Sequence, residues 1–252
     1  MLELFKQAFQ ITKRNYLVLM GLLLSVIVVM IFGNAIASLI GQNSFLGIIA
    51  NWVLILVRMA VSVLLVKYCL YIIRDIEPSF KEIKPSWNEV YKYLAYTLFS
   101  MVIFLLIFMV TISIFSSLGV VRPGLPDLYK TMLTDPNATI EKFTSSEILY
   151  GIAAFFLMCI PALLLYLRVQ FGTYLILEKN IDIFSAFGKS LKISKGYLFY
   201  IVITYLFIIL LNIAGILLFG IGLLFTMPMS MVVVALLYKS LDENYVEEIP
   251  AE

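Results

Sequence analysis

Histidine is absent from this chain of 252 residues, and charge is scarce: only 13% of the residues are Asp, Glu, Lys or Arg. A soluble domain carries about 25%. Without histidine the chain lacks the usual general base and the commonest metal ligand. Cys69 and Cys159 stand in apolar surroundings, which predicts two small buried side chains rather than a disulfide. We therefore expect no enzyme, no catalytic residue, no cofactor and no metal site.

What the chain has in excess is apolar surface: 62% of its residues are hydrophobic and its mean hydropathy is +1.02. Such a surface needs lipid as its solvent, and a helix of roughly 20 apolar residues crosses the bilayer core. A transmembrane barrel would alternate apolar and polar residues. The unbroken apolar run 17–32 excludes that pattern. The sequence therefore predicts an all-α, polytopic membrane protein.

Six membrane-spanning helices are predicted, paired into three hairpins within one membrane domain, 1–252. Their expected bounds are Tyr16–Ile40, Leu46–Lys67, Leu94–Leu118, the cap at Thr144 to Leu177, Tyr197–Phe219 and Ile221–Tyr238. Glu89 and Glu147 each follow a Ser or Thr by three residues, as Glu82 does, and this spacing is typical of a capping box at a helix start. Pro85 predicts a break before the second of these starts.

An amphipathic segment precedes each hairpin. The first covers 1–15, the second begins at Ser79, and the third begins at Ile181. In the second, one face carries Phe80, Ile83, Trp87, Val90, Tyr91 and Leu94; in the third, one face carries Phe184, Phe187 and Leu191. This pattern predicts helices that lie in the membrane interface, each covering the end of its own hairpin. A signal peptide cleaved near Ala35-Ile36-Ala37 is an alternative for the first, but the segment recurs where no signal peptide occurs.

Positive charge is concentrated on one side of the predicted spans. That side holds Lys6, Lys13, Arg14, Lys67, Arg74, Lys81, Lys84, Lys92, Lys179, Lys189, Lys192, Lys195 and Lys239. The opposite side holds Arg122, Lys130 and Lys142. By the positive-inside rule we expect a multi-pass protein of the cell membrane with cytoplasmic N- and C-termini. The loop 119–146 would then face outside, with a short helix near Asp127–Leu133 and a sequon at Asn137-Ala138-Thr139.

The three hairpin units are interpreted as parallel internal repeats, at about 1–78, 79–180 and 181–241, followed by a mobile acidic tail, 242–252. The run Ile11-Thr12-Lys13-Arg14-Asn15-Tyr16-Leu17 aligns with Ile193-Ser194-Lys195-Gly196-Tyr197-Leu198 after one deletion. The middle unit matches only in plan. Parallel repeats about an axis normal to the membrane either enclose a central space or pack solid.

The third unit carries a resemblance to a known family. The pattern Ala186-x-x-x-Ser190-x-x-x-x-Lys195-Gly196, with a glycine-rich hairpin and Pro228 after it, resembles a widespread prokaryotic family of six-helix integral membrane proteins. It is similar to the membrane domain attached to some glycerophosphoryl diester phosphodiesterases. The resemblance covers mainly residues 181–241 and implies a six-helix membrane domain. It implies no phosphodiesterase activity, because that chemistry belongs to a separate soluble barrel with histidines.

Two arginines lie within the predicted spans. Arg58 precedes Lys67 by nine residues and Arg168 precedes Leu177 by nine, so that both would lie about 14 Å deep. Burying an unpaired arginine there costs at least about 2.5–3.5 kcal/mol. One interpretation is a polar cavity in which both side chains bind an anion or a lipid phosphate. The alternative is that each bonds carbonyls, hydroxyls or water within the bundle.

Lys189, Lys192 and Lys195 are predicted to form a surface for lipid headgroups or for a cytoplasmic partner. Two functions remain open from the sequence. The first is transporter-like or lipid- and anion-handling activity around Arg58 and Arg168. The second is a non-transporting scaffold or partner subunit, including the permease subunit of an ABC-type exporter. The expected partners are membrane lipids and a protein partner or a second copy of the chain, with no nucleic acid.

Overall fold

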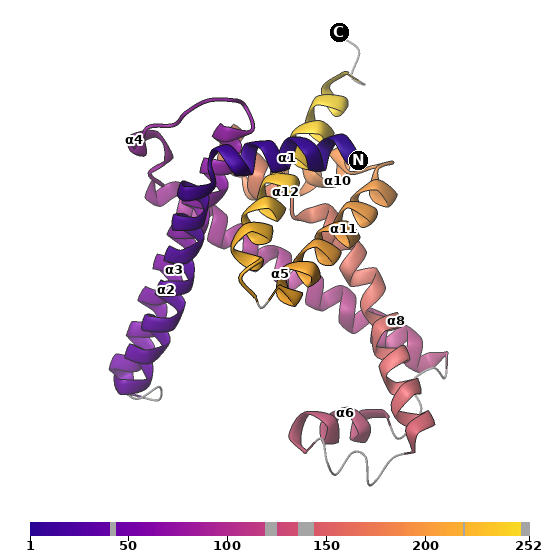
Figure 1. Cartoon of the computed structure of the whole chain (residues 1–252). Coiled ribbons are helices and arrows are strands. Elements are labelled where there is room, and N and C mark those ends of the chain that lie inside the picture. Colours follow the sequence, from indigo (N-terminus) through magenta and orange to yellow (C-terminus); the bar gives the residue numbers. More distant parts are fainter. Residues whose placement is uncertain (41–43, 119–124, 136–143, 219, 248–252) are drawn as a thin grey trace. The chain divides into compact units, whose positions relative to one another are not determined.

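The computed structural model describes residues 1–40, 44–118, 125–135, 144–218 and 220–247, and within these ranges every regular element is a helix (Figure 1). The helices are α1 (Leu2–Arg14), α2 (Tyr16–Ile40), α3 (Phe45–Ile72), α4 (Phe80–Ile83), α5 (Trp87–Ser117), α6 (Leu125–Thr134), α8 (Ser145–Val169), α9 (Gly172–Lys179), α10 (Ile183–Ile193), α11 (Leu198–Leu217) and α12 (Leu223–Glu247).

Six helical segments among the described residues are long and apolar enough to cross a membrane, which confirms the predicted all-α, polytopic architecture. They are α2, α3, α5, the α8–α9 pair, α11 and α12. The fourth differs from the prediction, because turn residues Gln170 and Phe171 divide it into α8 and α9. The short helix predicted in the loop is confirmed as α6, while the sequon at Asn137 lies outside the described residues.

The predicted capping boxes are confirmed by reciprocal or one-sided hydrogen bonds at the helix starts. At α5, the Glu89 backbone N–H donates to Ser86 Oγ (3.2 Å) and the Ser86 N–H donates to Glu89 Oε2 (2.7 Å). The Ser79 N–H likewise donates to Glu82 Oε2 at α4 (2.9 Å). Each contact satisfies a backbone donor that has no partner inside its own helix. Pro85 lies between α4 and α5, as predicted.

The chain forms two compact units. Residues 1–97 and 168–252 form the first, and residues 98–167 form the second. In the first unit, α3 contacts α9 and α12, and the rings of Tyr174 (α9) and Tyr238 (α12) stack with their centroids 5.2 Å apart. Side chains from these three helices are almost fully buried: Ile72, Leu175, Ile176, Val233 and Leu237. Around these helices the first unit is therefore packed with apolar side chains.

The second unit has its own apolar cluster. Leu128 from α6 is buried with Ala154 and Met158 from α8, and Phe108 and Phe115 from α5 pack against them. The ring of Phe104 meets that of Tyr166 edge-on, with centroids 6.4 Å apart. Helix α6 therefore covers part of the α5–α8 pair through Leu128.

The amphipathic lead helices contact neighbouring hairpins as well as their own. Helix α1 packs chiefly on α12, a helix of the third hairpin, where the ring of Phe9 meets that of Phe225 with centroids 5.5 Å apart, and it also contacts α2 of its own hairpin. Helix α4 contacts α3 of the first hairpin. Helix α10 contacts α9, which ends the second hairpin, and α12 of its own hairpin. The prediction that each lead covers its own hairpin therefore describes only part of these contacts.

Two further expectations are corrected. The second lead is a single turn, α4, because Pro85 stops it; on its predicted face Ile83 and Val90 are buried, whereas Phe80 and Trp87 are exposed. The tail 242–252 is helical as far as Glu247, since α12 continues and Asp242 binds Lys179.

Candidate functional site

Arg168 joins the end of α8 to α10. Its Nε donates to Ser194 Oγ (3.1 Å) and its Nη2 donates to the carbonyl of Leu191 (2.7 Å). In return Ser190 Oγ donates to the carbonyls of Arg168 (2.6 Å) and Val169 (3.1 Å). The last carbonyls of a helix have no partner within it, so these contacts satisfy the ends of both α8 and α10.

Tyr96 of α5 also binds the backbone at the break between α8 and α9. Its hydroxyl donates to the Val169 carbonyl at 2.5 Å, and the whole side chain is buried. Gly172 makes this approach possible, because a Cβ at that position would lie 1.9 Å from the Tyr96 hydroxyl oxygen. Hydrogen bonds from Tyr96 and Ser190 therefore fix the place where the fourth span is interrupted.

The two arginines are not equivalent, and the span that contains Arg168 is not the unbroken helix on which its predicted depth was based. That depth assumed one helix running to Leu177, whereas α8 ends at Val169 and Arg168 bonds to the last turn of α10. Arg58 is inside α3, where its partly buried side chain leaves Nε without a hydrogen-bond partner. The hydrogen bonds of Arg168 agree with the second interpretation, in which the arginine bonds groups within the bundle. Arg58 lies in an apolar stretch of α3, and its Nε has no such bond.

The three lysines of the third lead point in different directions. Lys189 is half-buried, and its Nζ lies 4.0 Å from Asp242 Oδ1. Burial and the neighbouring Lys179 ammonium hold the Lys189 pKa below its ordinary value. Lys192 and Lys195 are exposed. The predicted lysine surface is therefore reduced to these two, while Lys189 belongs to the contact between α10 and α12.

The apolar face predicted for α10 is likewise not the one it packs. Phe184 is exposed, whereas Ala186, Ser190 and Ile193 are buried. Small side chains at positions 186 and 190 let α10 approach its neighbours closely, as small residues do between membrane helices. The Ala-x-x-x-Ser spacing of the family-like pattern thus corresponds to the packed face.

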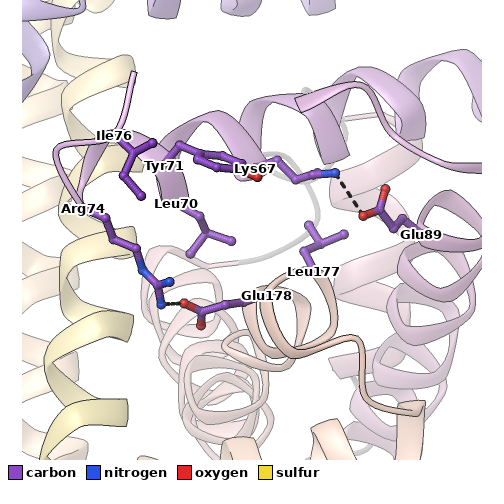
Figure 2. Close-up of a pocket in the computed structure, with 8 residues that line it drawn as sticks. All are labelled: Lys67, Leu70, Tyr71, Arg74, Ile76, Glu89, Leu177 and Glu178. Carbon is purple, nitrogen blue, oxygen red and sulfur yellow. Dashed lines mark hydrogen bonds and ion pairs between the residues drawn. The ribbon is translucent and has the colours of Figure 1, made fainter. Parts of the chain in front are cut away.

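Two ion pairs lie near the ends of α3 and α9. Arg74 Nη2 forms an ion pair with Glu178 Oε1, and Lys67 Nζ donates to Glu89 Oε1 at 3.0 Å. Between the two pairs is an open pocket of about 250 Å³, lined also by Leu70, Tyr71, Ile76 and Leu177. Figure 2 shows one ion pair at each end of the pocket, with Leu70 and Leu177 between them. We call this the α3 pocket.

The two carboxylates of the α3 pocket are held by second partners. Glu178 Oε2 accepts from the Tyr238 hydroxyl, and Glu89 Oε2 accepts the capping bond from Ser86. Glu178 is only 11% exposed, whereas its partner Arg74 is 50% exposed. The acidic groups are therefore fixed parts of the packed structure, and the guanidinium of Arg74 is the exposed member of its pair.

The length of α3 places this pocket at headgroup level. Helix α3 has 28 residues and is therefore about 42 Å long, whereas the hydrocarbon core is about 30 Å thick. Roughly 20 residues from Phe45 reach Leu64, so Lys67 and Arg74 lie beyond the core if the span begins near Phe45. The pocket is thus within reach of phosphates and other headgroup atoms.

Two other pockets lie in the first unit. One, of about 430 Å³, lies beneath α1 and is lined by Gln7, Gln10, Ile11, Arg14, Ile73, Asp75, Leu236 and Lys239. The other, of about 240 Å³, is mostly apolar and is lined by Val26, Ser62, Leu65, Val66, Cys69, Tyr93, Tyr174 and Met231. Neither Arg58 nor Arg168 lines these two or the α3 pocket, so none of the three is the cavity predicted from the sequence.

Lys67, Arg74, Glu89 and Glu178 were not singled out as site residues by the sequence. The signal available was the spacing of Lys67 and Arg74, seven residues apart, with Lys67 near the end of α3 and Arg74 in the turn that follows it. Their acidic partners come from other helices, and no spacing along the chain reveals that. Among the described residues, no group of three or more Cys, Asp or Glu side chains could hold a metal ion.

Comparison of the chain with protein-family models, with curated proteins and with solved structures gives no match. The resemblance to the membrane domain of glycerophosphoryl diester phosphodiesterases thus stays a prediction. What the six apolar helices do define is the class: the chain is an integral membrane protein.

Proposed function

We propose that this integral membrane protein handles lipids and that it binds a phosphate-bearing headgroup in the α3 pocket, between Lys67 and Arg74. The observation that carries the proposal is the presence of two cations at one end of α3, Lys67 within the helix and Arg74 in the turn after it, at headgroup level and lining one open pocket of about 250 Å³. This moves the proposed anion site from Arg58 and Arg168, because two donors of Arg168 are bound to α10.

Both cations keep donors for a phosphate. A lysine ammonium has three N–H donors, and Lys67 uses one on Glu89. An arginine guanidinium has five, and the half-exposed Arg74 uses Nη2 on Glu178. Arginine forks fit phosphate oxygens in pairs, and lysine adds a point charge, so the two side chains offer the usual chemistry of a phosphate site.

The test is lipid retention in a double variant, Lys67→Gln/Arg74→Gln, extracted in mild detergent and weighed with its bound lipids by native mass spectrometry. Each charge-assisted hydrogen bond contributes about 1.5–3 kcal/mol, so we expect retention of phospholipid to fall at least about tenfold. Lys179→Gln is the matched control, because Lys179 binds Asp242 at the end of α9 and does not line the α3 pocket.

Equal retention by the double variant and the control would contradict the proposal. A loss in both proteins would also contradict it, because it would indicate general damage to the paired charges. Folding is monitored separately, by the thermal unfolding midpoint of each variant in the same detergent.

We also propose that the termini are cytoplasmic and that the membrane is the cell membrane. The excess of Lys and Arg at the ends joined to α1, α10 and α12 supports this orientation. Reporter fusions placed after residue 247 and within the loop 119–146 test it: the first should report a cytoplasmic position and the second an external one. The reverse result would overturn the orientation and with it the leaflet assigned to the α3 pocket.

A further inference from the structure

We infer that the ligand of the α3 pocket is zwitterionic: it carries a phosphate and an ammonium group together, as a phosphoethanolamine headgroup does. This inference rests on the proposed function and narrows it to a class of ligand. It comes from the charge inventory of the pocket. Two cations, Lys67 and Arg74, are matched there by two anions, Glu89 and Glu178, so the lining is formally neutral.

A simple anion does not suit such a lining. When a phosphate binds the remaining donors of Lys67 and Arg74, it draws these cations toward itself and weakens their ion pairs with the carboxylates. Glu178 is 11% exposed and Glu89 is 23% exposed, so neither carboxylate is well solvated once its cation turns away. Leaving a buried charge without its partner is strongly unfavourable. An anion alone would therefore bind at the cost of two poorly solvated carboxylates.

An ammonium group on the same ligand removes this cost. It brings three donors, which replace those that the carboxylates lose to the phosphate. The carboxylates are suited to receive it because they are held in place by the Tyr238 hydroxyl and the Ser86 N–H. The net charge of pocket and ligand then stays at zero, which is the favourable state in a partly desolvated site.

The placement of the charges supports the same class of ligand. Each end of the pocket has one cation and one anion, with Leu70 and Leu177 between them, as Figure 2 shows. A ligand with separated positive and negative groups can therefore meet an opposite charge at either end. A phosphate diester with a neutral substituent, such as glycerol, would pair with the cations of the pocket but not with its carboxylates.

The experiment compares lipids that differ in headgroup charge. The full chain is kept in a nonionic detergent, and the binding of phosphatidylethanolamine or phosphatidylglycerol, each with a photoreactive acyl chain, is measured by crosslinking. We expect phosphatidylethanolamine to label the wild type at least about tenfold better than phosphatidylglycerol, a difference of about 1.4 kcal/mol. Lys67→Gln/Arg74→Gln should lose both signals.

The deciding variant is Glu89→Gln/Glu178→Gln. Glutamine keeps the capping bond of α5, because Gln serves at this position of a capping box, and it keeps an acceptor for Tyr238. The lining changes from neutral to a formal charge of +2, so the preference should reverse toward phosphatidylglycerol. Its thermal unfolding midpoint shows whether the variant is folded, and Asp242→Asn is a matched acidic control away from this pocket.

The outcomes separate the inference from the proposed function. If the wild type labels equally with both lipids and the Lys67/Arg74 variant labels with neither, the inference is overturned and the phosphate site stands. If the wild type labels with neither lipid, both are overturned. Free phosphoethanolamine added as a competitor distinguishes the source of the ligand: displacement at micromolar concentration indicates a soluble zwitterion, and displacement only at much higher concentration indicates the lipid.

Discussion

The ends of α3 and α9 are built alike but are used differently. At each end a cation is followed by a residue in the left-handed conformation: Arg74 before Asp75 (φ 56°) in the turn just after α3, and Lys179 before Asn180 (φ 49°) at the end of α9. Each left-handed side chain accepts from a cation of a distant helix. Arg14 Nη2 donates to Asp75 Oδ1 (2.7 Å), and Lys92 Nζ donates to Asn180 Oδ1 (2.8 Å). Asp and Asn tolerate this conformation better than most side chains.

The difference lies eight residues before the left-handed residue. At that position α3 has Lys67, whose side chain reaches Glu89 and borders the α3 pocket. At the corresponding position α9 has Gly172, whose missing side chain admits the Tyr96 hydroxyl. The corresponding position is therefore closed by packing in α9, whereas in α3 it borders an open pocket that Leu177 and Glu178 of α9 also line. The comparison predicts that Gly172 contributes mainly to packing and that Lys67 is available to the ligand proposed above.

The internal repeat predicted from the sequence can be compared with the contacts of the lead helices. Lead helices α1, α4 and α10 contact α12, α3 and α9, each of which ends a hairpin other than the lead's own. Three units related by rotation about an axis would give this order of contacts. The following predictions test the contrast between the two helix ends, from the largest expected effect to the smallest.

The largest effect is expected for Gly172→Ala at the start of α9. The new Cβ would lie 1.9 Å from the Tyr96 hydroxyl oxygen, so Tyr96 must move and the bond to Val169 must break. Overpacking costs about 1–3 kcal/mol, and the lost hydrogen bond costs about a further 0.5–1.5 kcal/mol, since Ser190 still donates to the Val169 carbonyl. Thermal or denaturant unfolding in detergent should show a loss of about 1.5–4.5 kcal/mol.

Gly188→Ala is the control, since nothing lies within 4 Å of its Cβ and alanine favours a helix. It should be neutral or slightly stabilising. Adding Tyr96→Leu to Gly172→Ala removes the hydroxyl oxygen and the ring carbons that would lie 1.9–2.7 Å from the new Cβ, and it should restore part of the stability. No rescue by Tyr96→Leu would contradict the steric explanation.

The second prediction concerns the two arginines. Arg168→Gln loses the bonds to Ser194 and Leu191, and hydrogen bonds of charged groups contribute about 1.5–3 kcal/mol, so the free energy of unfolding should fall by that amount. Arg58→Gln should cost less or stabilise, since its buried Nε has no partner to lose. Unfolding of both variants in the same lipid-detergent mixture checks the order. A larger loss of unfolding free energy for Arg58→Gln than for Arg168→Gln would contradict this prediction.

The third prediction is for Ser190→Ala, which removes the hydroxyl that donates to the carbonyls of Arg168 and Val169. Tyr96 still serves Val169, so only one carbonyl loses its side-chain donor, and the expected loss is about 1 kcal/mol. Ser185→Ala, at an exposed position of the same helix, should change stability by less than about 0.5 kcal/mol. Equal losses would show that the contact between α10 and the end of α8 contributes little.

The smallest effect is expected at the end of α3. Arg14 and Asp75 are 56% and 76% exposed, and exposed ion pairs contribute at most about 1 kcal/mol. Arg14→Gln should therefore lower the unfolding free energy by less than about 0.5 kcal/mol at ordinary salt, and raising the salt should abolish the difference. A loss above about 1 kcal/mol would mean that this end is closed as firmly as that of α9.

The spans could be predicted because each depends only on a local count of apolar residues, as in the run 17–32. The capping of α5 was predictable for the same reason, since Ser86 and Glu89 are three residues apart. The break after Val169 was not predictable, because it depends on Tyr96 and Ser190 arriving from distant helices. The ion pairs of the α3 pocket were not predicted either, because their acidic members also come from other helices. The positive-inside rule gave no help, since it assigns little weight to acidic residues such as Glu178.

The contact between α1 and α12 has a consequence for biosynthesis. Phe5 and Phe9 meet Phe207 and Phe225, rings that leave the ribosome some two hundred residues later. Synthesis proceeds at roughly 5–20 residues per second, so α1 waits about 10–40 seconds before its partners exist. During that time the membrane surface is the only apolar environment available to its aromatic face. Assembly of this protein is thus completed only after α12 has been synthesised, when α12 packs against α1.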